Sequence, residues 1–173
     1  CITTFNRQPY VLANIERLRR LAREVPSVAE AFRVTIVDNG RNLEVPPADG
    51  LSIRLIPNPN LGGAGGFARG LMHARHDGWT THVLFMDDDI TMEVESVVRA
   101  IALFRYATDP RLCVHGAMIS EEIPWMQFEA GSHYAWRYTY PLRAVGREDD
   151  LRDRITVLAD EPESQFEYTA WWF

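Results

Sequence analysis

"LSIRLIPNPNLGGAGGFARG", residues 51–70, joins a strand-like run to the glycine-rich beginning of a helix. Residues 51–56 are predicted to form a strand, and a helix is predicted over residues 67–78. The same order of strand and helix occurs before and after this stretch. Because strands alternate with helices, the sequence predicts an α/β fold with a mostly parallel sheet and helices on both faces.

The elements around this stretch follow the same pattern. We expect helices over residues 9–24 and 93–106, strands at residues 1–5 and 33–38, and a fully buried strand at residues 81–86. From about residue 116 the sequence becomes aromatic and irregular. We therefore expect one domain with an α/β half, residues 1–115, and a loop-rich half, residues 116–173.

Composition excludes several classes of protein. The chain has 173 residues, 46% of them hydrophobic, which suffices for a buried core. Its net charge of −6 argues against nucleic-acid binding, which needs clustered cations. Cys1 and Cys113 are too far apart in sequence to suggest a disulfide framework, and no apolar run is long enough to span a membrane. We expect a cytoplasmic protein, and both ends of the chain suggest a piece excised from a longer one.

Polar or glycine-rich residues follow each predicted strand. They are Asn6 and Arg7, Asp38 and Asn39, residues 58–66, and residues 87–89. In an open parallel sheet, ligands bind outside the carboxyl ends of the strands. The sequence therefore predicts a ligand site at this edge of the sheet.

Three adjacent aspartates, residues 87–89, end the predicted strand at 81–86. Three carboxylates repel one another and are costly to desolvate, and a bound divalent cation would compensate them. In an extended segment Asp87 and Asp89 point the same way, so they would share Mn²⁺ or Mg²⁺ with a diphosphate, while Asp88 points to the opposite side. Capping of the following helix is the alternative, and it explains one aspartate better than three.

The glycine run has two interpretations. The spacing Gly63-x-Gly65-x-x-Ala68 fits a dinucleotide-binding turn, but two prolines separate it from the strand. Alternatively, Gly62 and Gly63 let a ligand approach the backbone, and the helix that follows offers its amides to phosphate or sugar oxygens. Arg69 then faces the same ligand.

Five motifs together resemble the bacterial family-two glycosyltransferases of the GT-A fold, and in particular the galactofuranosyltransferases that build mycobacterial cell-wall galactan. The motifs are "TTFNR" (3–7), "VDNG" (37–40), "NPNLGGAGGFARG" (58–70), "FMDDDI" (85–90) and "WWF" (171–173). The resemblance implies inverting transfer from UDP-galactofuranose to a glycan or glycolipid acceptor, with Mn²⁺ or Mg²⁺ as cofactor. It implies polysaccharide biosynthesis in the cytoplasm, and it is compatible with a peripheral position of the full protein at the inner face of the plasma membrane.

The resemblance also assigns residues to roles. The metal ligands would be Asp87 and Asp89, and Trp171 and Trp172 would form the acceptor platform. The catalytic base of the family lies beyond the WWF motif, so we expect it beyond Phe173 and assign no catalytic residue. Residues 1–115 would bind the nucleotide sugar and residues 116–173 the acceptor. Donor contacts are expected from Phe5, Arg7, Asp38, Asn39, Asn60, Gly62, Gly63, Arg69 and Asp88.

Three alternatives stay open at this point. A transferase of the same fold that uses another donor, such as dTDP-rhamnose, would carry the same strand-end motifs. An NAD-type oxidoreductase would use the glycine run alone. A module that binds sugar nucleotides without turnover would keep the metal site. The acceptor, the linkage and the oligomeric state are not determined by the sequence.

Overall fold

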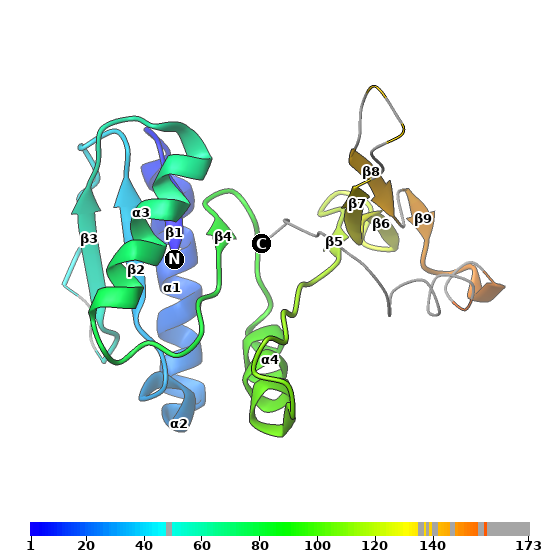
Figure 1. Ribbon diagram of the computed structural model, residues 1–173, viewed down its shortest axis with the longest axis horizontal. Helices are drawn as coiled ribbons and strands as arrows, with labels where there is room; N and C mark the ends of the chain where they lie inside the picture. Colours follow the sequence, from blue (N-terminus) through cyan, green and yellow to red (C-terminus); the bar gives the residue numbers. More distant parts are fainter. Residues whose placement is uncertain are drawn as a thin grey trace. The chain divides into compact units, whose positions relative to one another are not determined.

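The chain forms two compact units, Cys1–Thr108 and Asp109–Phe173. The computed structural model describes residues 1–47, 50–134, 137, 139, 142–145, 148–155 and 158 (Figure 1). The predicted acceptor platform, Trp171 and Trp172, lies outside the described residues.

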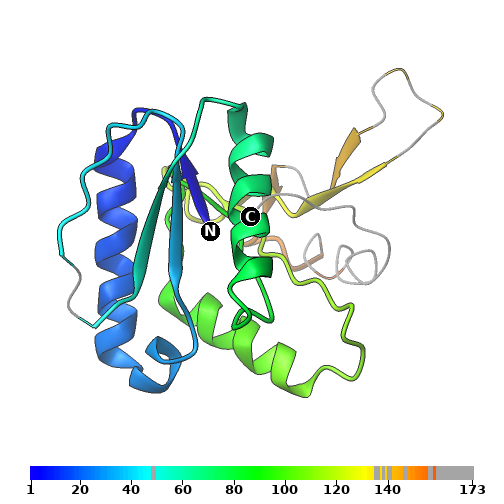
Figure 2. The ribbon, with the colours of Figure 1, turned by 60° about the vertical axis from the view of Figure 1, so that its left-hand side comes forward.

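The first unit is built on a four-stranded parallel sheet with the order β3-β2-β1-β4. Figure 2 shows the helices α1 and α3 on opposite sides of this sheet. The fold class predicted from the sequence is thus confirmed. The strands are β1 (Ile2–Thr4), β2 (Val34–Asp38), β3 (Ile53–Pro57) and β4 (Met86–Asp87), and the helices are α1 (Gln8–Glu24), α2 (Pro26–Ala29), α3 (Gly62–His76) and α4 (Val94–Tyr106).

The core lies between the sheet and α1. Val11, Ile15 and Leu21 of α1 are at most 1% exposed and belong to one apolar cluster with Ile2 and Ile36 of the sheet. Full burial of a side chain of this size stabilises the fold by about 1.5–3 kcal/mol. Partly buried residues of α4 pack against the same cluster. This packing fixes the strands whose carboxyl ends carry the predicted site.

The glycine run forms the first turns of α3, on the other face of the sheet. A Cβ atom on Gly66 would lie 1.8 Å from Oγ1 of Thr3, and one on Gly70 would lie 3.5 Å from Cγ2 of Val37. The helix begins at Gly62, five residues before the predicted start at residue 67. Close packing of helix on sheet, which only glycine permits here, outweighs the low helix propensity of glycine.

The prediction of a fully buried strand over residues 81–86 was wrong. Only Met86 of this run is in a strand and buried, while Leu84 is 45% exposed. Phe85 instead packs edge-to-face on Phe67 of α3, with ring centroids 5.4 Å apart. A short apolar run cannot reveal by itself whether it pairs in a sheet or packs as a loop under a helix.

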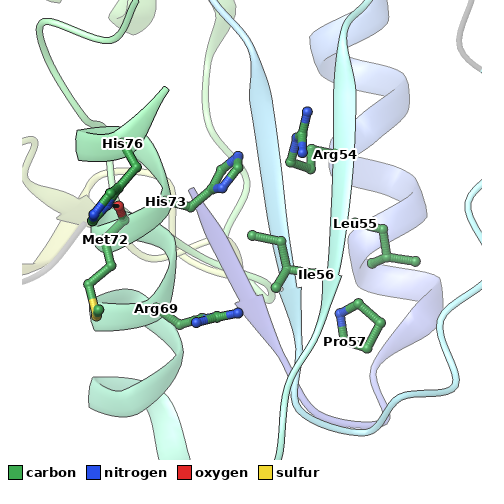
Figure 3. Close-up of a pocket in the computed structure, with 8 residues that line it drawn as sticks. All are labelled: Arg54, Leu55, Ile56, Pro57, Arg69, Met72, His73 and His76. Atoms are coloured by element: carbon green, nitrogen blue, oxygen red, sulfur yellow. Dashed lines mark hydrogen bonds between the residues drawn. The ribbon is translucent and has the colours of Figure 1, made fainter. Parts of the chain in front are cut away.

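An open cavity of about 460 Å³ lies between β3 and α3. Figure 3 shows Arg54 and Ile56 on the strand and Arg69 and His73 on the helix around it. β3 is the edge strand of the four-stranded sheet, so the cavity and β4 lie at opposite edges.

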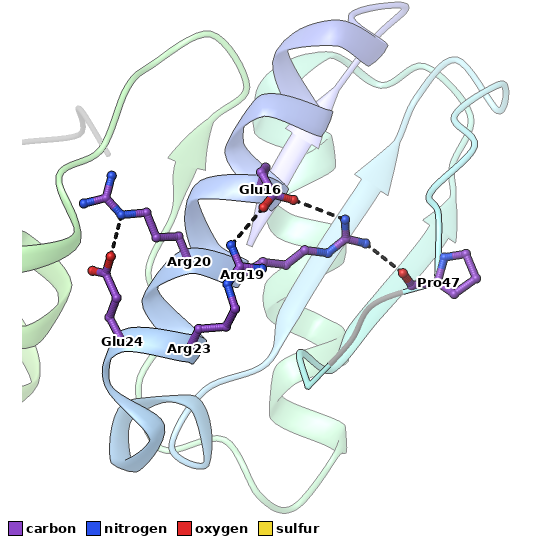
Figure 4. Close-up of polar contacts among 6 residues, drawn as sticks. All are labelled: Glu16, Arg19, Arg20, Arg23, Glu24 and Pro47. Carbon is purple, nitrogen blue, oxygen red and sulfur yellow. Dashed lines mark hydrogen bonds and ion pairs between the residues drawn. The ribbon is translucent and has the colours of Figure 1, made fainter.

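The loop between β2 and β3 is fastened to α1. Arg19 donates from Nη2 to the carbonyl oxygens of Pro46 and Pro47, at 3.1 and 3.0 Å. Figure 4 shows the bond to Pro47. The Arg19 side chain is only 16% exposed and also pairs with Glu16. Because this arginine joins two carbonyls of the loop to a rigid helix, it holds the loop that follows the predicted site residues Asp38 and Asn39.

The described part of the second unit consists of short antiparallel strands. One sheet has the order β5-β6-β9 and the other pairs β7 with β8. Arg152 stacks over Trp125, 4.6 Å from the ring centroid, and forms an ion pair with Asp150. No helix among the described residues is long and apolar enough to cross a membrane. The strands are β5 (Met118–Ile119), β6 (Met126–Glu129), β7 (Gly131–Tyr134), β8 (Leu142–Val145) and β9 (Asp149–Asp150).

Candidate functional site

The carboxyl ends of the parallel strands place the predicted residues along one edge of the first unit's sheet. The backbone N–H of Asn39 donates to the carbonyl of Thr4 at 2.9 Å, and that of Asn58 donates to the carbonyl of Asp38 at 2.9 Å. The parallel pairing therefore continues past the ends of β1, β2 and β3. Residues far apart in sequence become neighbours at this edge.

Asn39 links three strands and a helix through its buried side chain. Its Nδ2 donates to Oγ1 of Thr3 at 3.4 Å and to the carbonyl of Gly62 at 3.3 Å. Its Oδ1 accepts from Nδ2 of Asn58 at 2.8 Å. Both amide hydrogens are thus used within the protein, and only acceptor capacity on Oδ1 is left for a ligand.

Asp38 shapes the loop that follows β2. This residue is 2% exposed, and its two carboxylate oxygens accept the backbone N–H groups of Gly40 and Leu43, each at 2.8 Å. These bonds fold residues 39–43 back over the end of the strand. Contact of Asp38 and Asn39 with uridine stays a prediction, and the geometry adds a structural role to both.

Asp88 is the fixed member of the three aspartates. Its Oδ2 accepts from Oγ1 of Thr4 at 2.6 Å, and its Oδ1 accepts from Nη1 of Arg7 at 3.2 Å. Its backbone carbonyl accepts from Nδ2 of Asn14 at 2.9 Å. The side chain is only 7% exposed. Three partners from β1, α1 and the turn between them thus fix its position.

Arg7 joins the second and third aspartates. Its Nη1 forms an ion pair with Asp89 as well as with Asp88, and these two carboxylates raise the pKa of the guanidinium above its ordinary value. β4 ends at Asp87 and residues 88–89 form a turn, so the extended segment on which the pairing of Asp87 with Asp89 was based does not continue. Asp89 shares Arg7 with Asp88, and joint metal binding by Asp87 and Asp89 stays a prediction.

Asp87 differs from its two neighbours. It lies opposite Thr3 in the register of β1 and β4, is half-buried, and has no hydrogen-bond partner among the described residues. Burial, followed by the negative charges of Asp89 and Asp88, raises the pKa of its carboxyl group. Its charge is therefore poorly compensated, which suits a cation ligand.

The described residues contain no group of three or more His, Cys, Asp and Glu side chains that could hold a metal by themselves. A cation here would have protein carboxylates as part of its shell and ligand oxygens as the rest. Mn²⁺ and Mg²⁺ accept such mixed oxygen shells, because they are often bound by one or two carboxylates plus phosphate oxygens.

The remaining predicted donor contacts divide into two groups. Phe5 is 49% exposed, and Cβ atoms on Gly62 and Gly63 would meet nothing within 4 Å, so these residues are open to a ligand. Oδ1 of Asn60 instead accepts the N–H of Gly62 at 3.1 Å. Arg69 lies apart from the aspartates, in the cavity beside β3.

No individual role was predicted from the sequence for three supporting residues, Thr4, Asn14 and Asn58, although residues 58–66 were expected at the ligand edge. Thr4 and Asn58 gave no signal beyond their place at strand ends. Asn14 did carry one, because it is a polar residue in the apolar stripe of α1 between Val11 and Ile15. A buried amide in such a stripe needs a partner, which here is the carbonyl of Asp88.

Comparison with known proteins identifies the family of the chain. Residues 1–159 match the family described as glycosyl transferase family 2. The chain belongs to this family. Membership favours a glycosyltransferase over the dinucleotide-binding oxidoreductase, and contact of the glycine run with a ligand stays a prediction.

Two relatives show partial similarity. The galactofuranosyltransferase GlfT2 of Mycobacterium tuberculosis is 39% identical over 75 residues, which cover 43% of this chain and 12% of that protein. GlfT2 of Mycolicibacterium smegmatis is 44% identical over 66 residues, which cover 38% of this chain and 10% of that protein. The matched segments span about a tenth of the length of these relatives. No solved structure matches the chain significantly.

Proposed function

We propose that this chain binds UDP-galactofuranose with Mn²⁺ or Mg²⁺ and transfers the sugar, with inversion, to a galactan or another glycan acceptor. The observation that carries the proposal is the half-buried, unpaired carboxylate of Asp87 beside the Arg7, Asp88 and Asp89 cluster. Partial similarity to two galactofuranosyltransferases supports the choice of sugar.

Asp87 and Asp89 would hold the cation. Asp87 fits this role because burial and the charges of Asp89 and Asp88 outweigh the attraction of Arg7 and raise the pKa of its carboxyl group, and Asp89 fits because its side chain is 46% exposed. When bound, the cation would stabilise the negative charge that develops on the leaving diphosphate. Asp88 is buried and occupied by Thr4 and Arg7, so it would not join them.

Arg7 would contact the phosphates directly. Its side chain is 51% exposed, and the bonds to the aspartates use only Nη1. Nε and Nη2 keep their N–H groups for phosphate oxygens. Because Asp88 and Asp89 hold the guanidinium on one side, it is oriented before the donor arrives. Preorganised cationic donors of this kind lower the barrier for departure of an anionic leaving group.

The nucleotide would lie along the edge formed by Asp38, Asn39 and the start of α3. Phe5 offers an exposed ring that can stack on a base, and Gly62 and Gly63 leave space beside the first backbone amides of the helix. Acceptor binding by Trp171 and Trp172 remains part of the proposal, and no described residue is assigned as the base that takes the acceptor's proton.

Calorimetric titration tests the donor and the metal together. The full chain is titrated with UDP-galactofuranose, UDP-galactopyranose, dTDP-rhamnose and NAD, each with Mn²⁺ and with EDTA. We expect binding of UDP-galactofuranose that disappears in EDTA and in the variant Asp87→Asn. The control Asp109→Asn changes an exposed aspartate that pairs with Arg111, and it should bind as the unchanged chain does.

Each other outcome would change a stated part of the proposal. Preference for dTDP-rhamnose would replace the proposed donor, and metal-independent binding of the UDP sugar would remove the role of Asp87. Metal-dependent binding without turnover in the full-length protein would indicate a binding module.

A further inference from the structure

The cavity between β3 and α3 has a basic lining that the proposed donor site does not use. Eight residues surround it, of which Arg54, Arg69, His73 and His76 are basic and none is acidic. The chain as a whole has a net charge of −6. The basic lining is therefore a local feature of an acidic protein, and its residues come from β3 and α3.

On α3 these positions form one face. Arg69, Met72, His73 and His76 occupy positions i, i+3, i+4 and i+7, so they share one face of the helix. On β3, Arg54 and Ile56 pair with Thr35 and Val37 of β2, and Val37 lies on the side of the sheet that carries α3. Figure 3 shows the side chains of both elements around the same space.

Three of the four basic side chains of this cavity have no partner within the described structure. Among the residues that it describes, the side chains of Arg54, Arg69 and His73 form no ion pair or hydrogen bond. His76 is different, because its Nδ1 lies 2.6 Å from the carbonyl oxygen of Met72. Two arginines and a histidine therefore have N–H donors to offer to an anionic ligand.

The cavity is separate from the aspartate cluster. In the order β3-β2-β1-β4 it adjoins one edge strand, while Asp87 lies on the other. Three strand spacings of about 4.8 Å put about 14 Å between these strands. Asp87 and Asp89 would hold a cation at one edge strand, and Arg54 would hold an anion at the other. The two would thus be different ligands or distant parts of one ligand.

We propose that this cavity binds a phosphate ester, with its anionic oxygens on Arg54 and His73 at one end and on Arg69 at the other, and its organic part on Ile56 and Met72 between them. Arginine pairs with phosphate through two parallel N–H donors, which suits a tetrahedral oxyanion. The volume of about 460 Å³ exceeds what one phosphate fills and lies in the range of small-molecule sites. The apolar residues between the arginines favour an ester over the inorganic ion.

Inorganic pyrophosphate is the soluble probe for this site. The full chain is titrated with pyrophosphate at low salt in EDTA, so that no cation can bridge the probe to the aspartates. We expect saturable binding that weakens about tenfold in Arg54→Gln and in Arg69→Gln, because each loses a charge-assisted contact. Arg75→Gln is the matched control, since Arg75 is an exposed arginine of the same helix that does not line the cavity.

A second measurement separates a soluble ester from a lipid headgroup. The same variants are sedimented with phosphatidylcholine vesicles with and without phosphatidic acid. Binding that needs phosphatidic acid and is lost in Arg54→Gln assigns the cavity to a membrane lipid, and pyrophosphate binding alone assigns it to a soluble ester. Equal binding by the unchanged chain, Arg54→Gln and Arg69→Gln in both measurements overturns the proposal, as does absence of binding in both.

This inference and the proposed function can fail independently. Arg54→Gln should keep metal-dependent binding of the UDP sugar, whereas Asp87→Asn should keep pyrophosphate binding in EDTA. If Arg54→Gln abolishes donor binding instead, the cavity is part of the donor site and the separate phosphate site is excluded. Thermal unfolding of each variant checks that the exposed substitutions leave the fold intact.

Discussion

Arg7 and Asp88 form an ion pair across the ends of the neighbouring strands β1 and β4. Nη1 of Arg7 lies 3.2 Å from Oδ1 of Asp88, although 81 positions separate them in the sequence. Because Thr4 occupies the other oxygen of Asp88, this carboxylate is used within the protein. We therefore expect Asp88 to influence donor binding through Arg7, as a positioning residue.

The substitution Asp88→Asn tests this relationship. It keeps the shape of the side chain but removes the charge that orients Arg7. It also weakens the buried hydrogen bonds that Asp88 accepts from Thr4 and Arg7. We expect a loss of about 1–3 kcal/mol in the free energy of unfolding, measured in urea. Metal-dependent binding of UDP should weaken as well.

A double-mutant cycle with Arg7→Gln separates positioning from general destabilisation. If Asp88 acts through Arg7, the two substitutions together should weaken UDP binding no more than Arg7→Gln alone. Additive losses of affinity would show that Asp88 acts on the nucleotide by another route.

Gly66 and Gly63 form a matched pair on α3. A methyl group at Gly66 would collide with Thr3, whereas one at Gly63 meets nothing. We expect Gly66→Ala to lower the free energy of unfolding by about 1–3 kcal/mol through forced shifts of the backbone. Gly63→Ala should instead raise it by about 0.5–1 kcal/mol because alanine favours the helix. Equal stability of the two variants in urea would contradict this packing.

Asn14 is expected to stabilise the turn that carries the aspartates. The substitution Asn14→Ala removes the donor to the buried carbonyl of Asp88 and leaves that carbonyl unpaired. The expected cost is about 1–3 kcal/mol in the free energy of unfolding. Hydrogen exchange at the amides of residues 86–90 should also become faster. Faster exchange only within α1 would place the effect in the helix and contradict the proposed link.

Asp77 gives a test of pH dependence away from the site. The N–H and hydroxyl groups of Thr80, with the N–H of Trp79, lower the pKa of its carboxyl from 3.8 to about 2. Because the folded pKa is below the unfolded one, its contribution to stability is present above about pH 4 and is lost as pH falls toward 2. The stability difference between the unchanged chain and Asp77→Asn should shrink over this window.

The titration of Asp77 can also be followed directly. Its carboxyl carbon resonance in NMR spectra should shift with a midpoint near pH 2. A midpoint at or above the ordinary value for aspartate would show that the bonds to Trp79 and Thr80 do not form in solution.

The order of helices and strands could be predicted because it rests on local patterns. Apolar spacing over residues 9–24 and 93–106 gave α1 and α4 to within a residue at either end. Strand-end motifs led to the family, which the match over residues 1–159 confirms. The prediction of a strand over residues 81–86 was wrong because Met86 is the only residue of this stretch that pairs with β1, followed by Asp87.

What the sequence by itself determined is the α/β alternation, the family and the identity of the polar residues at the strand ends, because these are properties of short contiguous segments. Only the tertiary structure decided which of three adjacent aspartates is buried and held, which one is unpaired, and where Arg69 lies. These outcomes depend on partners distant in sequence: Thr4, Arg7 and Asn14 for Asp88, and Arg54 for the cavity beside α3. Charge and hydrogen bonding act over a few ångströms in space, so they are settled only when folding brings those partners together.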